Sequence, residues 1–400
     1  MFVAHDQDGN SVSLIGLDRN SALKLKNSGP YFCPACKKPV FMKAGRQKLP
    51  HFAHLERCPV KPGGESGKHL AGKKALFHWL VKNGYEVRLE QYLPEIQQRP
   101  DLLIRAGQRL IALEFQVSEI PVDSLVARTK AYSDYGVFPI WILDAGLIRE
   151  RQHGILDFSD FLAFFIQRTS VGIPSLYTLD PERRIFMVYT NLFPYSPQRA
   201  FSERKDFPLD VNVKTICRWQ PPPVRFYDYW YPMMEKWLIG LTVSRSARRD
   251  PFINHLYKHQ IHPLQLPPEV GLPVRDLHLI KTPAFTWQGF IWHHFLYNNQ
   301  DRRASFTLAD VRRFLFVNLK GMVKKRLVAS LWQDAAKTCP VEHYLRVLCE
   351  LGYLKNDGQR FTIGKKARLI HNPNREREVL MKDFYRRNKG IIVRSLLLTK

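Results

Sequence analysis

The chain has 400 residues, of which 61 are Lys or Arg and 36 are Asp or Glu, so its formal net charge is +25 at pH 7. A chain of this length exceeds one ordinary hydrophobic core, and two or three domains are therefore expected. No apolar run is long enough for a membrane helix, and residues 1–9 are too polar for a secretory signal, so we expect a cytoplasmic protein without a membrane span.

The positive charge is concentrated toward the end of the chain. Residues 301–400 hold 23 Lys and Arg against 9 Asp and Glu, a surplus of 14 positive charges. A polyanion is the expected partner of such a surface, and nucleic acid is the commonest polyanion. A solvated basic face without a nucleic-acid partner is the alternative. The six cysteines do not form the regular pattern of a disulfide framework, so reduced thiols are expected.

Residues 1–61 are expected to form a small β-rich module. Apolar residues in the segments 1–4 and 12–15 flank the turn-forming sequence Asp8-Gly9-Asn10. This pattern predicts a β-hairpin at the start of the chain.

The same module carries a pattern of metal ligands. Cys33 and Cys36 form a Cys-x-x-Cys motif, and His51 and His54 form a His-x-x-His motif after it. These two pairs can supply four ligands to one tetrahedral Zn²⁺. The histidine spacing is one residue shorter than in the usual zinc finger, so Cys58 is an alternative to one histidine. A small segment has little core, which favours structural zinc over free thiols and packed histidines.

Residues 62–150 are expected to form an α/β domain. The spacing of apolar residues predicts a helix, three strands, a second helix and a fourth strand, in that order. The expected elements are a helix over Lys68–Lys82, strands over Tyr85–Leu93, Arg99–Arg105 and Arg109–Val117, a helix over Pro121–Gly136 and a strand over Val137–Leu143. Because the second helix crosses over between the last two strands, these strands are predicted to pair in parallel.

Three polar residues of this domain can converge at one end of the sheet. Glu114 and Gln116 lie two apart on a strand and share a face, and Asp101 lies on the neighbouring strand across a hairpin. Neighbouring carboxylates make an oxygen-rich site for Mg²⁺, and such a site in a basic chain suggests phosphodiester cleavage. A lone carboxylate inside the apolar run 110–115 would be costly to bury, which favours a functional role over a solvated surface charge.

Residues spaced four apart bring further polar groups to one flank of each helix. Glu65, His69 and Lys73 share a flank at the first helix, where an exposed helix start is an equally good interpretation for Glu65 and His69. Arg128 and Tyr132 share a flank of the second helix and are expected to bind phosphate or to hold the site. The possible accessory residues are Glu65, Lys73, Glu90, Arg128 and Tyr132.

The order of elements, with Pro100 and Asp101 followed by Glu114-Phe115-Gln116, resembles the restriction-endonuclease-like core of the PD-(D/E)xK nucleases. With the Cys-Pro-Ala-Cys and His-Phe-Ala-His motifs ahead of it, the segment 1–143 resembles the competence protein CoiA family. The resemblance implies a zinc-finger-like module, a nuclease-like domain and a role in natural transformation, where imported single-stranded DNA is processed for recombination.

The same resemblance implies roles for individual residues. Asp101 and Glu114 correspond to the metal-binding acidic pair, and Gln116 occupies the place that lysine usually holds. His69 corresponds to a helical histidine of one branch of these nucleases. Arg128-x-x-x-Tyr132 is similar to that branch's Gln-x-x-x-Tyr motif, with Arg in place of Gln. The implied ligands of a catalytic Mg²⁺ or Mn²⁺ are His69, Asp101, Glu114 and the backbone carbonyl of Phe115.

The departure at Gln116 bears on catalysis. A lysine there would position the attacking water and stabilise negative charge, whereas glutamine is uncharged and accepts no proton. An imidazole ligand would make Mn²⁺ as suitable as Mg²⁺. Like Asp101 and Glu114, Glu90 is a carboxylate on an expected strand, and the sequence does not decide whether it joins the site.

Residues 151–400 are expected to form a basic, mostly helical region, but their pattern is less informative. A hairpin is expected at Asp180-Pro181-Glu182-Arg183, and a linker is expected at Gln220–Pro223. The aromatic residues of segment 225–237 suit a helix core better than stacking on single-stranded bases. Residues 305–370 suggest a winged helix. Its expected elements are helices over Leu308–Phe316, Val323–Thr338 and Val341–Leu351 and a hairpin over Asn356–Ile363, followed by the basic Lys365, Lys366 and Arg368.

These observations favour a zinc-containing, metal-dependent DNA nuclease or DNA-processing factor of transformation and recombination. The expected partners are single-stranded or branched recombination intermediates and recombination proteins. Two alternatives stay open. One is a DNA-binding or recombinase-loading adaptor with an inactive nuclease fold, and the other is a restriction-type defence nuclease.

Overall fold

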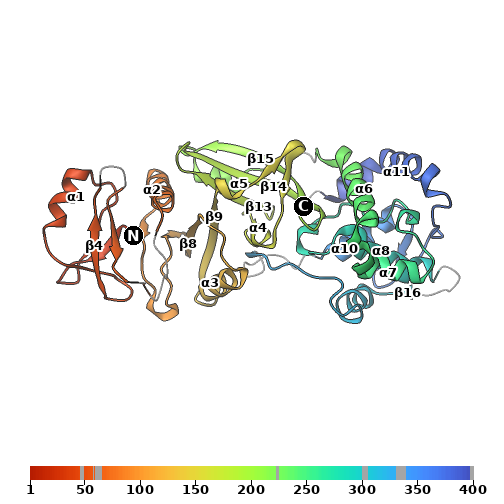
Figure 1. Cartoon of the computed structure of the whole chain (residues 1–400), viewed down its shortest axis with the longest axis horizontal. Coiled ribbons are helices and arrows are strands. Elements are labelled where there is room, and N and C mark those ends of the chain that lie inside the picture. The colour runs from red at the N-terminus through yellow and green to blue at the C-terminus, as the bar shows by residue number, and fades with distance from the viewer. Residues whose placement is uncertain are drawn as a thin grey trace.

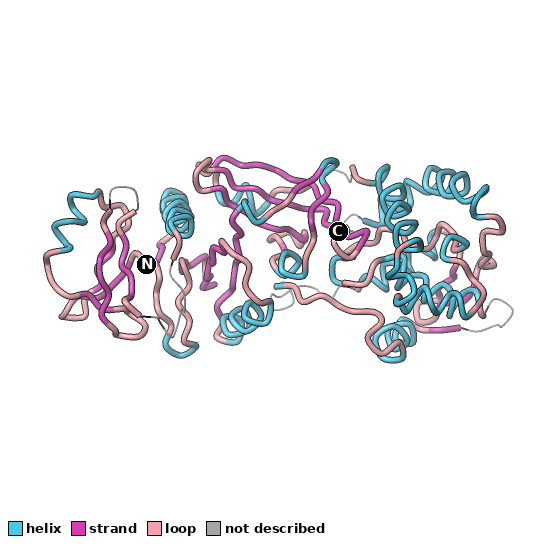
Figure 2. The backbone as a smooth tube through the Cα atoms, in the orientation of Figure 1, coloured by secondary structure: helices cyan, strands magenta, loops and turns pink. Residues whose placement is uncertain are grey.

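The computed structural model describes residues 1–45, 49–56, 58, 65–221, 225–299, 305–329 and 339–396. Three regions follow one another along the long axis of the molecule (Figure 1). A β-rich module at the N-terminus precedes a large sheet with flanking helices, and a helical region occupies the other end (Figure 2).

The N-terminal module is one antiparallel sheet. Strands β1 (Val3–His5) and β2 (Ser11–Ser13) pair with His5 opposite Ser11, which confirms the hairpin expected at the start of the chain. The five strands are ordered β2-β1-β3-β4-β5. The remaining elements are α1 (Arg19–Lys26), β3 (Tyr31–Phe32), β4 (Pro39–Lys43) and β5 (His51–His54). Phe2 and Phe52 of its core pack in the same buried cluster as Leu70, so this core continues onto the next region.

The central region begins with the expected order of helix, three strands, helix and strand. The elements are α2 (Gly67–Lys82), β6 (Val87–Leu89), β7 (Leu102–Ala106), β8 (Arg109–Gln116), α3 (Val122–Asp134) and β9 (Val137–Asp144), with the short helix η1 (Pro94–Ile96) after β6. Strands β7 and β8 form an antiparallel hairpin. Strands β8 and β9 pair in parallel, from Leu110 opposite Val137 to Gln116 opposite Leu143, as the crossover helix predicts.

The sheet continues beyond β9, so the boundary expected at residue 150 is not the end of this structural unit. Strand β13 (Pro174–Asp180) pairs in parallel with the open edge of β9. Strand β14 (Ile185–Ser196) follows it through the hairpin expected at Asp180–Arg183 and pairs with β15 (Arg199–Pro208). The full order is β10-β11-β15-β14-β13-β9-β8-β7-β6. The shorter elements are η2 (Ala145–Leu147), β10 (Glu150–Arg151), η3 (Gln152–Gly154), β11 (Ile155–Asp157), α4 (Asp160–Phe164), β12 (Gln167–Arg168) and α5 (Val213–Arg218).

The two faces of this sheet are covered by different helices. Successive side chains of β8 point to opposite faces. Phe115 packs against α2, where a Cβ added at Gly72 would lie 2.0 Å from the Phe115 ring, so glycine permits this close approach. Glu114 instead faces Arg128 and Tyr132 of α3. Glu114 and Phe115 of β8 therefore face different helices, α3 and α2.

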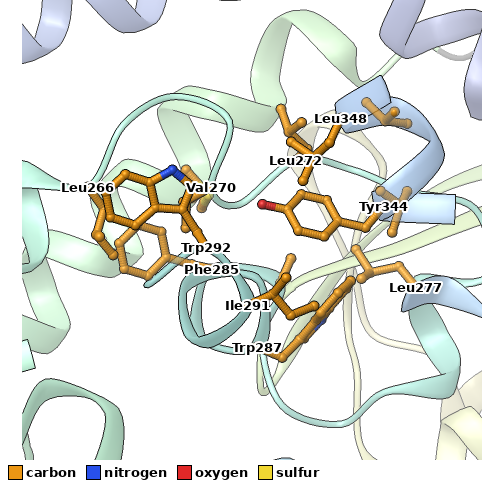
Figure 3. Packing of buried hydrophobic residues seen from close by; sticks show 14 of the residues in the cluster. Leu266, Val270, Leu272, Leu277, Phe285, Trp287, Ile291, Trp292, Tyr344 and Leu348 are labelled. Carbon is orange, nitrogen blue, oxygen red and sulfur yellow. The ribbon is translucent and has the colours of Figure 1, made fainter. Parts of the chain in front are cut away.

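The C-terminal region is built on one large apolar core, part of which is drawn in Figure 3. The expected aromatic helix is α6 (Tyr227–Val243), and its Trp230 is fully buried and donates from Nε1 to the Gly271 carbonyl at 2.8 Å. Tyr229 is the exception, with 45% of its surface exposed. The helix-core interpretation is therefore confirmed. Of the expected linker, residues 222–223 lie outside the described part of the chain.

Several further helices complete this region. They are η4 (Arg245–Arg249), α7 (Pro251–Lys258), η5 (Pro263–Gln265), η6 (Leu277–Leu279), α8 (Ala284–Ile291), the π-helix η7 (Trp292–Tyr297) and α11 (Pro373–Leu396). The sequence patterns missed α11, a highly charged helix of 24 residues whose Tyr385 accepts a hydrogen bond from Tyr227 through its carbonyl. Within the described residues, no helix combines the length and apolar character needed to cross a membrane.

Residues 305–370 contain part of the expected winged-helix pattern. Strands β16 (Ser305–Phe306), β17 (Leu354–Asn356) and β18 (Phe361–Ile363) form a three-stranded sheet, accompanied by α9 (Leu308–Arg313), the π-helix η8 (Phe314–Asn318) and α10 (Pro340–Glu350). The helix expected over Val323–Thr338 is wrong for residues 323–328, which are not helical, and residues 330–338 lie outside the described part. Arg326 explains the difference, because its side chain is buried and its backbone N–H bonds the Leu279 carbonyl at 2.8 Å.

Candidate functional site

Asp101 lies where α2, β7 and β8 meet. Because Leu102 of β7 pairs with Leu113 of β8, Asp101 enters the hairpin beside the next residues of β8. Its Oδ2 accepts the Phe115 backbone N–H at 3.0 Å and contacts His69 Nε2 at 2.9 Å. The carboxylate is only 1% exposed, so these contacts fix its position.

Glu65 and His69 extend this carboxylate into a three-residue group. His69 Nδ1 lies 4.0 Å from Glu65 Oε2, as expected for residues four apart. One ligand atom each from Glu65, His69 and Asp101 lies within 4.8 Å of the others. Ser66 caps α2 by accepting the His69 N–H at 3.1 Å, which fixes the first turn of the helix. Two carboxylates and an imidazole so close together can bind a metal ion.

Glu114 is held by residues of α3. Its Oε1 accepts hydrogen bonds from Arg128 and, at 2.6 Å, from the Tyr132 hydroxyl. Burial alone would lower the pKa of Arg128, but the Glu114 carboxylate raises it above its usual value. Burial and the same carboxylate raise the pKa of Tyr132 well above its ordinary range. The structure therefore brings Arg128 and Tyr132 to Glu114, whereas the group that can bind a metal comprises Glu65, His69 and Asp101.

A buried lysine lies beside this group. Lys73 is fully buried and donates to Glu65 Oε2 and Glu90 Oε1. Burial would lower the pKa of Lys73, but the two carboxylates outweigh it and raise the pKa. Glu90 also accepts the backbone N–H groups of Phe2 at 2.8 Å and Val3 at 3.1 Å. This network joins the N-terminal module to the central sheet next to the acidic residues.

Gln116 and Phe115 are the last two residues of β8, where the pairing with β9 fixes their backbone. The Gln116 amide donates to the Ser118 carbonyl at 2.7 Å, and the residue is partly exposed. Phe115 is opposite Ile142 in the parallel pairing of β8 and β9. The catalytic and metal-binding roles that the sequence suggests for these two residues stay predictions.

The N-terminal module gathers Cys33, Cys36, His54 and Cys58, whose ligand atoms lie within 4.8 Å of one another. His51 is outside this group, and its Nδ1 contacts the Leu49 carbonyl at 2.8 Å. The reason is strand geometry, because residues three apart on β5 point to opposite faces. The structure thus brings together the set in which Cys58 replaces one histidine, a group of three cysteines and one histidine that can hold a metal ion.

The chain matches family models along most of its length. The N-terminal domain of competence protein CoiA matches residues 14–61, the CoiA nuclease-like domain matches residues 65–218, and the CoiA C-terminal domain matches residues 240–377. The chain belongs to the competence protein CoiA family. The CoiA nuclease-like match ends after β15 and α5, in agreement with the extended sheet.

One curated CoiA relative covers nearly the whole chain. It is the competence protein CoiA of Bacillus subtilis (strain 168), which is 27% identical over 364 residues, covering 90% of this chain and 95% of the relative. No solved structure matches the chain.

Arg99 is a residue of this CoiA chain that the sequence patterns missed. It is 6% exposed, and its Nη1 lies 3.0 Å from Met1 Sδ and 3.9 Å from Cys33 Sγ. The contact places a buried guanidinium of the central region directly beside one member of the cysteine group. The sequence feature that could have drawn attention to Arg99 is its position directly before Pro100 and Asp101.

Proposed function

We propose that this chain acts in natural competence as a DNA-processing factor whose nuclease-like domain cleaves phosphodiester bonds with a divalent cation. The observation that carries the proposal is the convergence of Glu65, His69 and Asp101 at the end of the β7–β8 hairpin, within 4.8 Å. Membership of the CoiA family and the name of the Bacillus relative support the competence role. They give no support to a restriction-type defence nuclease.

The residues present fit such a cation. Two carboxylates supply the oxygen ligands that Mg²⁺ and Mn²⁺ prefer, and one imidazole shifts the preference toward Mn²⁺. Asp101, Glu65 and His69 would hold it, with Glu114 and the Phe115 carbonyl as further candidates. Bound there, the cation would stabilise negative charge that develops on the phosphate oxygens.

The protein's own residues have separate tasks in this proposal. Phe115 and His69 fix the Asp101 carboxylate through the 3.0 Å and 2.9 Å contacts, so no reorientation of Asp101 is needed. Arg128 neutralises Glu114 in the absence of substrate, and its side chain is 23% exposed, which leaves it able to turn toward a phosphate. Gln116 can orient a water molecule through its amide but accepts no proton.

Zinc is the proposed ion of the Cys33, Cys36, His54 and Cys58 group, because three thiolates and an imidazole are typical of structural zinc. DNA is the proposed partner, in agreement with the net charge of +25. Single-stranded or branched recombination intermediates, and recombination proteins, are the proposed targets.

An inactive, DNA-binding adaptor is the second candidate. The specific observation in its favour is that cations of the protein already occupy the acidic residues: Lys73 bonds Glu65 and Glu90, and Arg128 bonds Glu114. A divalent cation would meet their repulsion. Gln116 in place of lysine points the same way.

Cleavage assays separate the two candidates. The full chain is incubated with single-stranded, duplex and branched DNA in Mg²⁺ or Mn²⁺. We expect cleavage by the native protein and by Glu119→Gln, an exposed carboxylate three residues after Gln116, and no cleavage by Asp101→Asn. Asparagine can still accept the Phe115 N–H, so the variant tests the charge while keeping the fold. DNA binding without cleavage in either metal would support the adaptor.

A further inference from the structure

Three histidines of the helical C-terminal region lie together, far along the chain from the residues described above. His255 is in α7, His259 directly follows α7, and His293 is in the π-helix η7. Their ligand nitrogens lie within 4.8 Å of one another. None of them takes part in the acidic group or in the cysteine group.

The arrangement follows from helix geometry. His255 and His259 are four residues apart, so their side chains share one face of α7 and its final turn. Helix α8 continues into η7, and such π-helical turns are frequent at functional sites. The ring centroids are 4.9 Å apart for His255 and His259, 4.9 Å for His255 and His293, and 4.5 Å for His259 and His293.

The spacing of one nitrogen pair suits a tetrahedral ion. Nε2 of His255 and Nδ1 of His293 are 3.1 Å apart. Two nitrogens bound to one tetrahedral zinc at its usual bond length are separated by about 3.3 Å. A hydrogen bond between two neutral imidazoles also accounts for the 3.1 Å contact, but it does not account for the third ring. Each imidazole offers one ligand nitrogen, and a metal ion is the partner that can use all three together.

We propose that His255, His259 and His293 bind a divalent transition-metal ion of the zinc class. The donor set is entirely imidazole nitrogen, which suits Zn²⁺, Co²⁺, Ni²⁺ or Cu²⁺ and disfavours Mg²⁺ and Ca²⁺. His293 is 2% exposed whereas His259 lies at the surface, so the ion joins the buried η7 to the end of α7. Three protein ligands leave a fourth position for water or another ligand on the solvent side.

Cobalt spectroscopy of the full chain tests this site separately from the cysteine group. After removal of bound metal with a chelator, the protein is titrated with Co²⁺. Cobalt at the cysteine group gives a thiolate-to-metal charge-transfer band, whereas cobalt bound only by imidazoles gives visible ligand-field bands without it. We expect the native protein to bind Co²⁺ in both ways, and excess Zn²⁺ to displace both signals.

The variants compare two exposed histidines, one inside the group and one outside it. His259→Ala should weaken the imidazole-type cobalt signal by roughly a hundredfold in affinity, because one of three ligands is lost, and should leave the thiolate band unchanged. His294→Ala is the matched control, because His294 is outside the group. Its ring stacks on that of Phe314, with the ring centroids 4.1 Å apart. This control variant should keep both signals.

Thermal unfolding adds a second measurement. Zinc beyond that bound by the cysteine group should raise the melting temperature of the native protein and of His294→Ala, and not that of His259→Ala. The proposal is overturned if the native protein shows no imidazole-type cobalt signal. Equal cobalt affinity and equal zinc stabilisation in His259→Ala and His294→Ala would overturn it as well.

Discussion

Replacement of Lys73 by methionine should destabilise α2 and its contact with the N-terminal module. Lys73 is fully buried, and its ammonium group bonds both Glu65 and Glu90. Methionine fills a similar volume but leaves two buried carboxylates without their cation. Removal of one partner from a buried ion pair costs about 3–5 kcal/mol of stability. Because two buried carboxylates lose their cation in this variant, we expect a cost at the upper end of that range.

The pH dependence of stability should change sign in this variant. In the native protein, burial would raise the pKa of Glu90, but Lys73 lowers it below its usual value, so Glu90 contributes stability at neutral pH that is lost as the pH falls through the lowered pKa. The raised pKa of Lys73 contributes stability that is lost only as the pH rises through it. Without Lys73, burial dominates and the folded variant gains a proton at Glu90 on acidification. Its stability should therefore increase from pH 7 to pH 5.

Hydrogen exchange of the α2 amides in the full chain measures the free energy of opening locally, which a multidomain melting curve does not. Lys82→Met is the control, because Lys82 is an exposed lysine at the end of the same helix. A cost below about 1 kcal/mol for Lys73→Met, similar to that expected for a surface change, would refute the reasoning. So would a variant whose stability falls on acidification as in the native protein.

Three further predictions concern zinc, DNA and catalysis. Elemental analysis should show zinc loss in Cys36→Ser and zinc retention in His51→Ala, because His51 faces away from the cysteine group; equal zinc content in both variants would contradict the ligand set. Replacement of Lys366 and Arg368 by glutamine should weaken DNA binding and reduce the slope of log affinity against log salt by about 0.7–0.9 for each phosphate that the protein no longer neutralises, and an unchanged slope would place the DNA surface elsewhere. Gln116→Lys should raise the cleavage rate if glutamine is a weaker substitute, whereas Gln116→Ala should lower it modestly; opposite changes in a gel-based cleavage assay would count against that role.

Local patterns predicted the central elements because those elements are defined by local periodicity. The apolar spacing of α2, the hairpin between β7 and β8, and the crossover through α3 are all contained in short segments, and the structure confirms them. The flank shared by Glu65, His69 and Lys73 likewise follows from spacing alone.

Contacts between distant segments explain what the patterns missed. The strand expected over Tyr85–Leu93 ends at Leu89, because Glu90 adopts a left-handed conformation, with φ of 51°, and bonds the N–H groups of Phe2 and Val3. Those residues are more than eighty positions away, and no local pattern encodes their approach. The pairing of β13 with β9 is similarly non-local, because β13 follows β9 only after an irregular segment with short strands and helices.

The opposite example is His51, whose position the sequence could have revealed. Once residues 51–54 are recognised as a strand, the alternation of side chains separates His51 from His54 and favours Cys58 as the fourth ligand. The usual zinc-finger spacing of histidines belongs to a helix, and this segment is not helical. A rule for ligand spacing therefore depends on the secondary structure that carries the ligands.

The acidic group and the cysteine group are structurally linked. Glu90 bonds the first strand of the N-terminal module, and Lys73 connects Glu90 to Glu65. Arg99 lies beside Cys33 and two residues before Asp101. If the cysteine group binds a metal ion, as proposed above, loss of that ion should destabilise the N-terminal module and weaken the hydrogen bonds that Phe2 and Val3 donate to Glu90. We therefore expect the N-terminal module to help position the candidate catalytic carboxylates, so that its folding and the geometry of the acidic group are coupled.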